Sequence, residues 1–143
     1  MTNRFFRKCG VALAANVVFG VILAFPALAQ NNYALVVAVS KYENLDETLW
    51  LAGPVNDAKL VHEYLRDGAP IDFTEDGITL LADGIDGAAT PTNAHIHEAF
   101  AALAEKAEPG DFVFLHFSGH GSQAPARVEG EEQDGLDELF LPS

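Results

Sequence analysis

FVFLHFSGHG, residues 112–121, joins a strongly hydrophobic segment directly to a turn that is rich in glycine. The hydrophobic part, residues 112–117, has the length and composition of a buried strand. His120 stands between Gly119 and Gly121, and glycines at such a place permit a tight turn and the close approach of another backbone. The segment therefore predicts a strand that ends in a turn carrying a histidine.

The residues before this strand predict the rest of an α/β fold. Residues 33–39 (YALVVAV) form a continuous hydrophobic run, as expected for a strand that is buried on both faces. Residues 54–68 and 93–107 carry hydrophobic residues at helical spacing, and Thr92 is a suitable N-cap for the second helix. Residues 78–82 (ITLLA) form a short strand between the two helices. This order of strand, helix, strand, helix and strand predicts a mostly parallel sheet.

The histidine lies where such a sheet binds its ligands, beyond the carboxyl ends of the strands. A neutral imidazole at position 120 can take a proton from a thiol or hydroxyl near neutral pH and return it to a leaving amine. The backbone N–H of Gly121 has no side chain in the way and can donate a hydrogen bond to a developing oxyanion. The alternative is a histidine that only occupies a glycine turn, and residues 118–121 alone do not decide between the two.

The first 29 residues have the pattern of a signal peptide. Three positive charges in residues 4–8 precede a hydrophobic stretch, residues 11–25, and Ala27-Leu28-Ala29 has the small-x-small pattern that signal peptidase cuts. The hydrophobic stretch is shorter than the roughly 20 residues of a membrane helix, so a retained anchor is the less favoured alternative. We therefore expect secretion, or export to the periplasm, and no membrane association of residues 30–143 once the signal is removed.

Charge and cysteine content narrow the classes of function. Eight Lys and Arg stand against 21 Asp and Glu, and the formal net charge of −13 would become −16 without the signal segment. Such a chain lacks the basic surface that nucleic-acid binding requires, whereas it suits basic substrates or cations. The single cysteine, Cys9, lies in the expected signal peptide. Residues 30–143 can therefore form no disulfide, and their fold must depend on a hydrophobic core.

Four segments in a fixed order carry a family resemblance. They are the 33–39 strand, residues 53–58 (GPVNDA) at the start of a helix, FVFLHFSGHG, and residues 134–138 (DGLDE) before a hydrophobic strand. Together they resemble the caspase-like cysteine peptidases, and among these the metacaspases and their bacterial relatives. The resemblance covers nearly all of residues 30–143 and implies a three-layer α/β/α sandwich, here the N-terminal part of the domain. It also implies that His120 is the catalytic histidine and that Gly121 supplies an N–H of the oxyanion hole.

The same resemblance implies cleavage of peptide or protein substrates after Arg or Lys. Asp57 matches an aspartate that lines the specificity pocket of metacaspases, and Ser118 matches another position of that pocket. A carboxylate in such a pocket favours a cationic side chain and can bind Arg through two hydrogen bonds. Alternatively, Asp57 stabilises the first turn of its helix through the helix dipole, and both roles can coexist. The loop Ser40-Lys41-Tyr42 has no arginine to receive an acidic substrate, which favours basic specificity.

The nucleophile of this family is absent from the sequence. The cysteine is expected about 50 residues after the histidine, whereas the sequence ends 23 residues after His120 and directly after a hydrophobic run, which indicates a truncated domain. Because the chemistry needs a thiolate, we expect the chain to have no peptidase activity. The alternative is a non-catalytic caspase-like binding module, or a fragment whose open sheet edge gives poor amide protection. A serine hydrolase is a remote further alternative, since no G-x-S-x-G motif occurs.

Residues 129–138 carry six carboxylates in ten positions. Metacaspases of one type bind activating calcium through aspartates near this place, so Asp134 and Asp137 are candidate ligands, although the family chemistry requires no cofactor. The spacing is not that of an EF-hand, because Leu141 stands where the bidentate Glu is needed. A solvated acidic loop is therefore the favoured alternative. Zinc is not expected, because none of the histidine spacings matches a zinc-protease motif.

Overall fold

The computed structural model of the chain describes residues 30–128 and 130–143. The expected signal peptide, residues 1–29, lies outside the described residues. Within the described ranges, no helix is both long enough and hydrophobic enough to cross a membrane.

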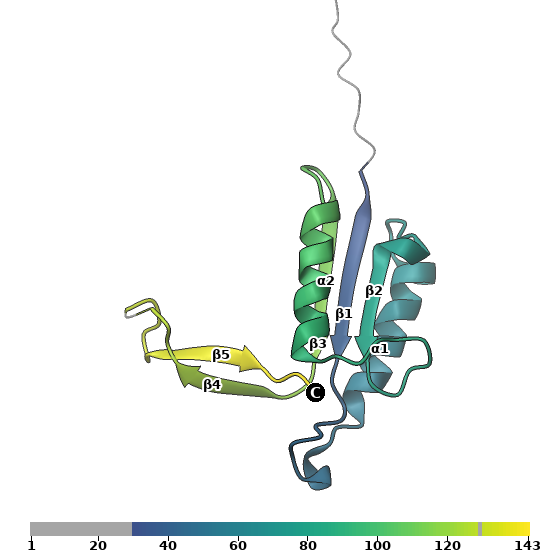
Figure 1. The fold of residues 1–143 in the computed structure, drawn as a ribbon. Coiled ribbons are helices and arrows are strands. Elements are labelled where there is room, and N and C mark those ends of the chain that lie inside the picture. Colours follow the sequence, from purple (N-terminus) through teal and green to yellow (C-terminus); the bar gives the residue numbers. More distant parts are fainter. Residues whose placement is uncertain (1–29, 129) are drawn as a thin grey trace, which may run out of the picture.

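A three-stranded parallel sheet, two main helices and an antiparallel hairpin make up the fold (Figure 1). The sheet has the strand order β2-β1-β3, with β1 at Asn32–Ala38, β2 at Ile78–Ala82 and β3 at Phe112–Ser118. Helix α1 (Gly53–Glu63) follows β1 and continues as a π-helical turn, Tyr64–Gly68, and α2 (Asn93–Lys106) connects β2 to β3. The hairpin consists of β4 (Gly121–Pro125) and β5 (Leu136–Phe140), and short 3-10 turns occupy Glu47–Leu49 and Glu75–Gly77.

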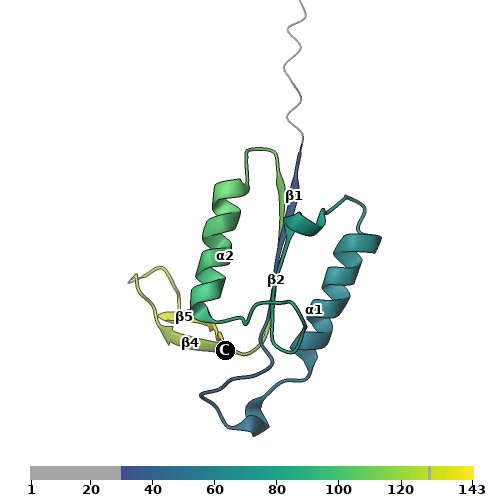
Figure 2. The same cartoon turned by 45° about the vertical axis from the view of Figure 1, so that its right-hand side comes forward.

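The two helices cover opposite faces of the sheet (Figure 2). Successive side chains of a strand point to opposite faces, so β1 divides its hydrophobic residues between two clusters. Ala34, Val36 and Ala38 pack with α1 residues, whereas Leu35 and Val37 pack with α2 residues. All five are at most 1% exposed, which confirms the prediction of a strand buried on both faces. The predicted three-layer α/β/α arrangement with a mostly parallel sheet is confirmed.

Local signals place the ends of the helices. The Thr92 hydroxyl accepts a hydrogen bond from the His95 N–H at 3.2 Å, so the predicted N-cap of α2 is confirmed. The first helical segment ends at Gly68, where the sequence predicted its end. Helix α1 itself begins at Gly53, one residue before Pro54, and its N-cap residue Ala52 makes no side-chain hydrogen bond. A side chain from outside the helix supplies this bond, since the Ser40 hydroxyl accepts from the Val55 N–H at 3.2 Å.

Strand β3 is the outer strand on one side of the described sheet and pairs only with β1. Its hydrophobic side chains Phe112, Val113, Leu115 and Phe117 are between 38% and 48% exposed. An exposed strand edge of this kind leaves backbone N–H and C=O groups without a strand partner. The open edge predicted from the sequence is therefore present in the described part of the chain.

Candidate active site

The site lies at the carboxyl edge of the sheet, where the ends of β1 and β3 meet. In the parallel pairing of these strands Ala38 stands beside Ser118, and the Val39 N–H donates to the Ser118 carbonyl oxygen at 2.9 Å. The loop that follows β1, residues 39–52, therefore begins next to the turn after β3. This turn carries His120. Two segments far apart in the sequence thus form one site.

The imidazole of His120 is half-buried and is held by one ring nitrogen. Its Nε2 lies 2.7 Å from the carbonyl oxygen of Leu49, at the end of the 3-10 turn Glu47–Leu49. Because a carbonyl oxygen can only accept, Nε2 carries the proton, and the lone pair of the neutral ring is on Nδ1. No hydrogen bond between described residues uses Nδ1. Nδ1 is therefore the atom that can act as a base.

The backbone N–H of Gly121 is directed away from the neighbouring strand. Gly121 pairs with Phe140 in the antiparallel hairpin, and the Leu141 N–H donates to the His120 carbonyl oxygen at 3.0 Å. Hydrogen-bonded and non-hydrogen-bonded pairs alternate in such a ladder, so this bond places the Gly121–Phe140 pair at a non-hydrogen-bonded position. The exposed Gly121 thus has an N–H that β5 does not use, directly after the histidine. This orientation suits a donor to an oxyanion.

Asp57 and Ser118 are brought together although 61 residues separate them. The Ser118 hydroxyl, at the end of β3, donates to Asp57 Oδ2 at 2.7 Å. Ser118 lies two residues before His120, so this bond holds the exposed Asp57 carboxylate beside the turn that carries the histidine. Since α1 begins at Gly53, Asp57 is its fifth residue, and the first turn of α1 contains no acidic residue. The expectation that Asp57 stabilises the first turn is therefore wrong, because the dipole effect is confined to that turn.

The loop after β1 is held in place by hydrogen bonds that do not involve the site itself. Asp83, directly after β2, accepts from the N–H groups of Ser40 at 2.7 Å and Lys41 at 2.9 Å. The Leu51 N–H donates to the Ser40 carbonyl at 2.9 Å, which closes the loop on itself. The closure sets the position of the intervening Leu49 carbonyl, to which the imidazole binds.

Sequence reasoning missed two groups that contact His120. The phenol oxygen of Tyr42, a residue only 3% exposed, accepts a hydrogen bond from the His120 N–H at 2.6 Å. The two rings also lie 4.9 Å apart between centroids. An aromatic residue close behind a buried strand was the only sequence signal for Tyr42. Leu49 contributes its main chain alone, so no pattern of side chains could have indicated it.

Comparison with known proteins identifies the family of this site. Residues 32–143 match the family model described as the metacaspase, peptidase C14 domain. The chain belongs to the metacaspase family. Metacaspase-7 of Arabidopsis thaliana is 34% identical over 110 residues, which are 77% of this chain and 26% of that relative. Metacaspase-1 of Mycosarcoma maydis is 35% identical over 118 residues, 82% of this chain and 28% of that relative. The predicted family resemblance is confirmed, and the chain spans about a quarter of the length of the curated relatives it matches.

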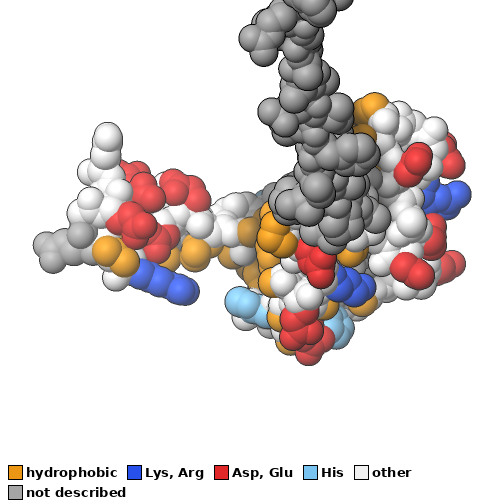
Figure 3. All heavy atoms as spheres, turned by 90° about the horizontal axis from the view of Figure 1, so that it is seen from above, with side chains coloured by type: hydrophobic (Ala, Val, Ile, Leu, Met, Phe, Trp, Pro, Cys, Tyr) orange, Lys and Arg blue, Asp and Glu red, His pale blue; other side chains and the backbone are white. Residues whose placement is uncertain are grey.

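The metacaspase resemblance also suggested calcium ligands, and each of these two carboxylates accepts a hydrogen bond from a different main-chain N–H of the hairpin. Asp134 Oδ1 accepts from the Leu136 N–H at 3.1 Å, and Asp137 Oδ2 accepts from the Arg127 N–H at 3.2 Å. Acidic side chains gather at the outer end of the hairpin (Figure 3), where Asp134 lines a shallow hollow with three neighbouring acidic residues but without Asp137. Within residues 30–128 and 130–143, no group of three or more His, Cys, Asp or Glu is arranged to hold a metal ion. Calcium binding by Asp134 and Asp137 stays a prediction.

His116 differs from its expected state in this metacaspase chain. In the sequence, His116 alternates with Phe112 and Phe114, and this spacing predicts a core histidine with its hydrogen bonds satisfied. The Nε2 atom is buried but has no hydrogen-bond partner among the described residues. The expectation was therefore wrong for this nitrogen, and the hydrophobic surroundings of β3 provide no acceptor or donor for it.

Proposed function

We propose that residues 30–143 supply the base, the oxyanion donor and the recognition carboxylate of a cysteine endopeptidase that cleaves proteins or peptides after Arg or Lys. The observation that carries the proposal is the 2.7 Å hydrogen bond from Ser118 to Asp57, which brings a carboxylate beside the turn of His120. The family supports the peptidase class. The proposed preference for Arg or Lys in the substrate is supported by the Asp57 carboxylate and by its position beside the turn of His120.

In the proposed cleavage of a peptide bond, His120, Gly121 and Leu49 each have one role. Nδ1 of His120 takes the proton of a thiol, and the thiolate attacks the carbonyl carbon of the substrate. The Gly121 N–H donates to the oxyanion that forms, while the Leu49 carbonyl accepts from Nε2 and steadies the imidazolium. The imidazolium then gives its proton to the leaving amine, and water hydrolyses the acyl-enzyme. Residues 30–143 contain no cysteine, so the sulfur has to come from outside these residues.

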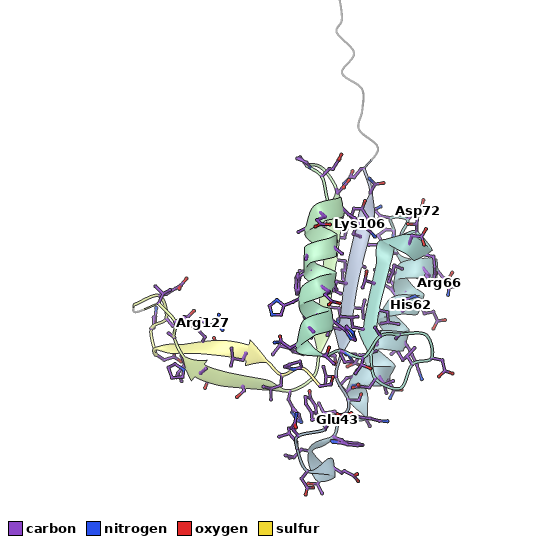
Figure 4. All side chains as sticks on the ribbon, in the orientation of Figure 1. Glu43, His62, Arg66, Asp72, Lys106 and Arg127 are labelled. Carbon is purple, nitrogen blue, oxygen red and sulfur yellow. The ribbon has the colours of Figure 1, made fainter. Side chains whose placement is uncertain are left out.

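Charge around Asp57 supports a cationic substrate side chain. An exposed carboxylate attracts a cation, and Arg can bind it through two parallel hydrogen bonds. An acidic substrate would instead need cationic groups of the protein near the site. The two arginines of residues 30–143 lie elsewhere, with Arg66 in the turn that ends α1 and Arg127 on the hairpin (Figure 4). Lysines are present, with Lys41 over the ring of Trp50 and Lys59 two residues after Asp57 in α1, so the exposed carboxylate itself, rather than an absence of cations, supports Arg or Lys in the substrate.

The chain is expected to show no peptidase activity by itself, because no thiol accompanies His120 in residues 30–143. Fluorogenic peptides with Arg, Lys or Asp before the cleaved bond measure this directly. The rate should equal that of the His120→Ala variant for every peptide. A rate that falls on removal of His120 would show that the chain contains its own nucleophile, and this part of the proposal would then be wrong.

Replacing Asp57 with Asn is expected to weaken the binding of N-acetyl-arginine methylamide by about 3- to 10-fold. This loss of affinity corresponds to a free energy between that of an exposed ion pair and that of a charged hydrogen bond in a protected site. Asn keeps an oxygen for the Ser118 hydroxyl, so the change removes charge more than local structure. Chemical-shift titration of the amide signals of residues 57 and 118 gives the dissociation constant.

The matched control for this binding experiment is Asp67→Asn, which removes the same charge beyond the other end of α1. We expect Asp67→Asn to leave the affinity for the arginine compound unchanged. The citrulline analogue of that compound has no charge, and we expect it to bind the unaltered chain as weakly as the arginine compound binds the Asp57→Asn variant. Equal losses in the two variants would mean that only the overall negative charge attracts the ligand. The proposed pocket role of Asp57 would then be rejected.

We also propose that residues 1–29 direct secretion or export to the periplasm. The basic start, the hydrophobic stretch and the Ala27-Leu28-Ala29 pattern support this. N-terminal sequencing of the exported protein should find Gln30 as the first residue.

A further inference from the structure

Tyr42 occupies an unusual place for a buried tyrosine, since its polar end is directed at the site. The ring belongs to the hydrophobic cluster between the sheet and α2, and the residue is 3% exposed. Its oxygen accepts from the His120 N–H at 2.6 Å, and its ring lies against the imidazole at a centroid distance of 4.9 Å and an interplanar angle of 41°. Tyr42 thus contacts both the main chain and the side chain of the histidine.

The preceding residue, Gly119, leaves no space between Tyr42 and the hairpin. A Cβ atom at this position would lie 2.8 Å from the Tyr42 hydroxyl and 3.0 Å from Cε2 of Phe140. The φ angle of Gly119 is not positive, so the glycine is needed here for space rather than for backbone conformation. Two aromatic side chains, Tyr42 and Phe140, therefore close around the place where a side chain of residue 119 would stand.

Tyr42 also holds the segment that contacts the other side of the imidazole. Its carbonyl oxygen accepts from the Leu45 N–H at 2.9 Å and from the indole Nε1 of Trp50 at 3.1 Å. Trp50 is the neighbour of Leu49, whose carbonyl binds Nε2 of His120. Tyr42 therefore holds the His120 main chain through its phenol oxygen. Through its own carbonyl oxygen, it also holds the segment that contains the Leu49 carbonyl, the acceptor of the imidazole.

We propose that Tyr42 is a positioning residue for His120, whose phenol oxygen holds the histidine main chain so that Nε2 stays on the Leu49 carbonyl and Nδ1 stays available for proton transfer. This inference rests on the proposed function of His120 as the base. Burial above all raises the pKa of Tyr42, so the phenol is neutral throughout the physiological range of pH. The hydrogen bond between phenol and amide therefore joins two neutral groups and persists through that range.

The test is Tyr42→Phe, which keeps the buried ring and removes only the oxygen. In nitrogen-15 NMR spectra of the full chain, the unaltered protein should show a His120 Nε2–H signal, because the bond to Leu49 slows its exchange with water. In the variant this signal should broaden or disappear, and the backbone amide of His120 should exchange roughly 2- to 10-fold faster, the factor for one lost hydrogen bond. The amides of β1 should keep their protection.

Tyr64→Phe is the matched control, since it removes an exposed phenol oxygen that makes no hydrogen bond among the described residues. We expect it to leave both His120 signals unchanged. If Tyr42→Phe also leaves them unchanged, Tyr42 only fills the core and the proposal is wrong. Absence of the Nε2–H signal in the unaltered chain would overturn it as well, whether or not a variant folds. These readouts need no peptidase activity, so failure of the positioning role is distinguishable from failure of the proposed peptidase function.

Discussion

Replacing Leu35 with alanine is expected to lower the free energy of unfolding by about 2–5 kcal/mol, the usual range for a large-to-small change in a core. Leu35 is 1% exposed, and it packs between the central strand and α2, where Ile96 and Leu103 contact the same cluster. Strand β1 is paired on both sides, so its main chain cannot easily move to fill the cavity. Urea unfolding followed by circular dichroism measures the loss.

Leu115 provides a matched control, because it is the residue beside Leu35 in the pairing of β1 with β3. It is 48% exposed, so truncation to alanine removes about half as much buried surface and should cost about 1 kcal/mol. The two variants differ in burial but not in residue type or strand register. Equal losses would contradict the exposed edge of β3 and would mean that another molecule covers this strand in solution.

The elements of the sandwich could be predicted because their signals are local. The doubly buried strand 33–39, the short strand 78–82 and the helix capped by Thr92 each depend on hydrophobic spacing and caps within a few residues. The observed bounds differ from the predicted ones by one residue at most for these three elements. The order of the elements then restricts the topology to a parallel sheet with a helix on each face.

The β4 strand was not predicted, and its sequence explains why. Residues 121–125 (GSQAP) have neither hydrophobic alternation nor a high strand propensity, and Pro125 removes one backbone donor. The strand exists through its pairing with β5, which lies more than ten residues away in the chain. This pairing matters for the site, because it determines where the Gly121 N–H points.

The sequence indicated the chemical groups of the site, whereas their partners could only come from the fold. His120 and Gly121 were predicted from the glycine turn at the carboxyl end of a strand and then through the family resemblance, whereas Asp57 and Ser118 were predicted through the resemblance alone, and the family itself is confirmed. The contact between Tyr42 and His120 joins residues 78 positions apart, and the Leu49 carbonyl is a main-chain group. The start of α1 likewise depends on Ser40 from another segment, and the exact place of Asp57 in its helix was therefore misjudged.

Substituting Gly119 with alanine is expected to destabilise the chain by about 1–3 kcal/mol and to displace His120, as overpacking of a closed site does. The added methyl group would meet the Tyr42 hydroxyl at 2.8 Å and two ring carbons of Phe140 at 3.0 and 3.1 Å. Tyr42 is buried, and Phe140 is held by β5 and by an edge contact with Phe117, so neither ring can move freely. Urea unfolding gives the loss of stability, and the His120 Nε2–H signal reports the displacement.

Gly121→Ala tests whether the two glycines around the histidine serve different purposes. A Cβ at Gly121 would have its closest neighbour, the Leu139 carbonyl oxygen, at an ordinary contact distance of 3.6 Å. Its φ is not positive, so we expect a change in stability within about 0.5 kcal/mol and an unchanged Nε2–H signal. If Gly121→Ala instead lowers the stability and changes the Nε2–H signal more than Gly119→Ala does, the side chains of Tyr42 and Phe140 can move to admit a methyl group, whereas the strand at Gly121 cannot. In that case the tight packing at Gly119 would not fix the histidine, and its orientation would depend on the hairpin instead.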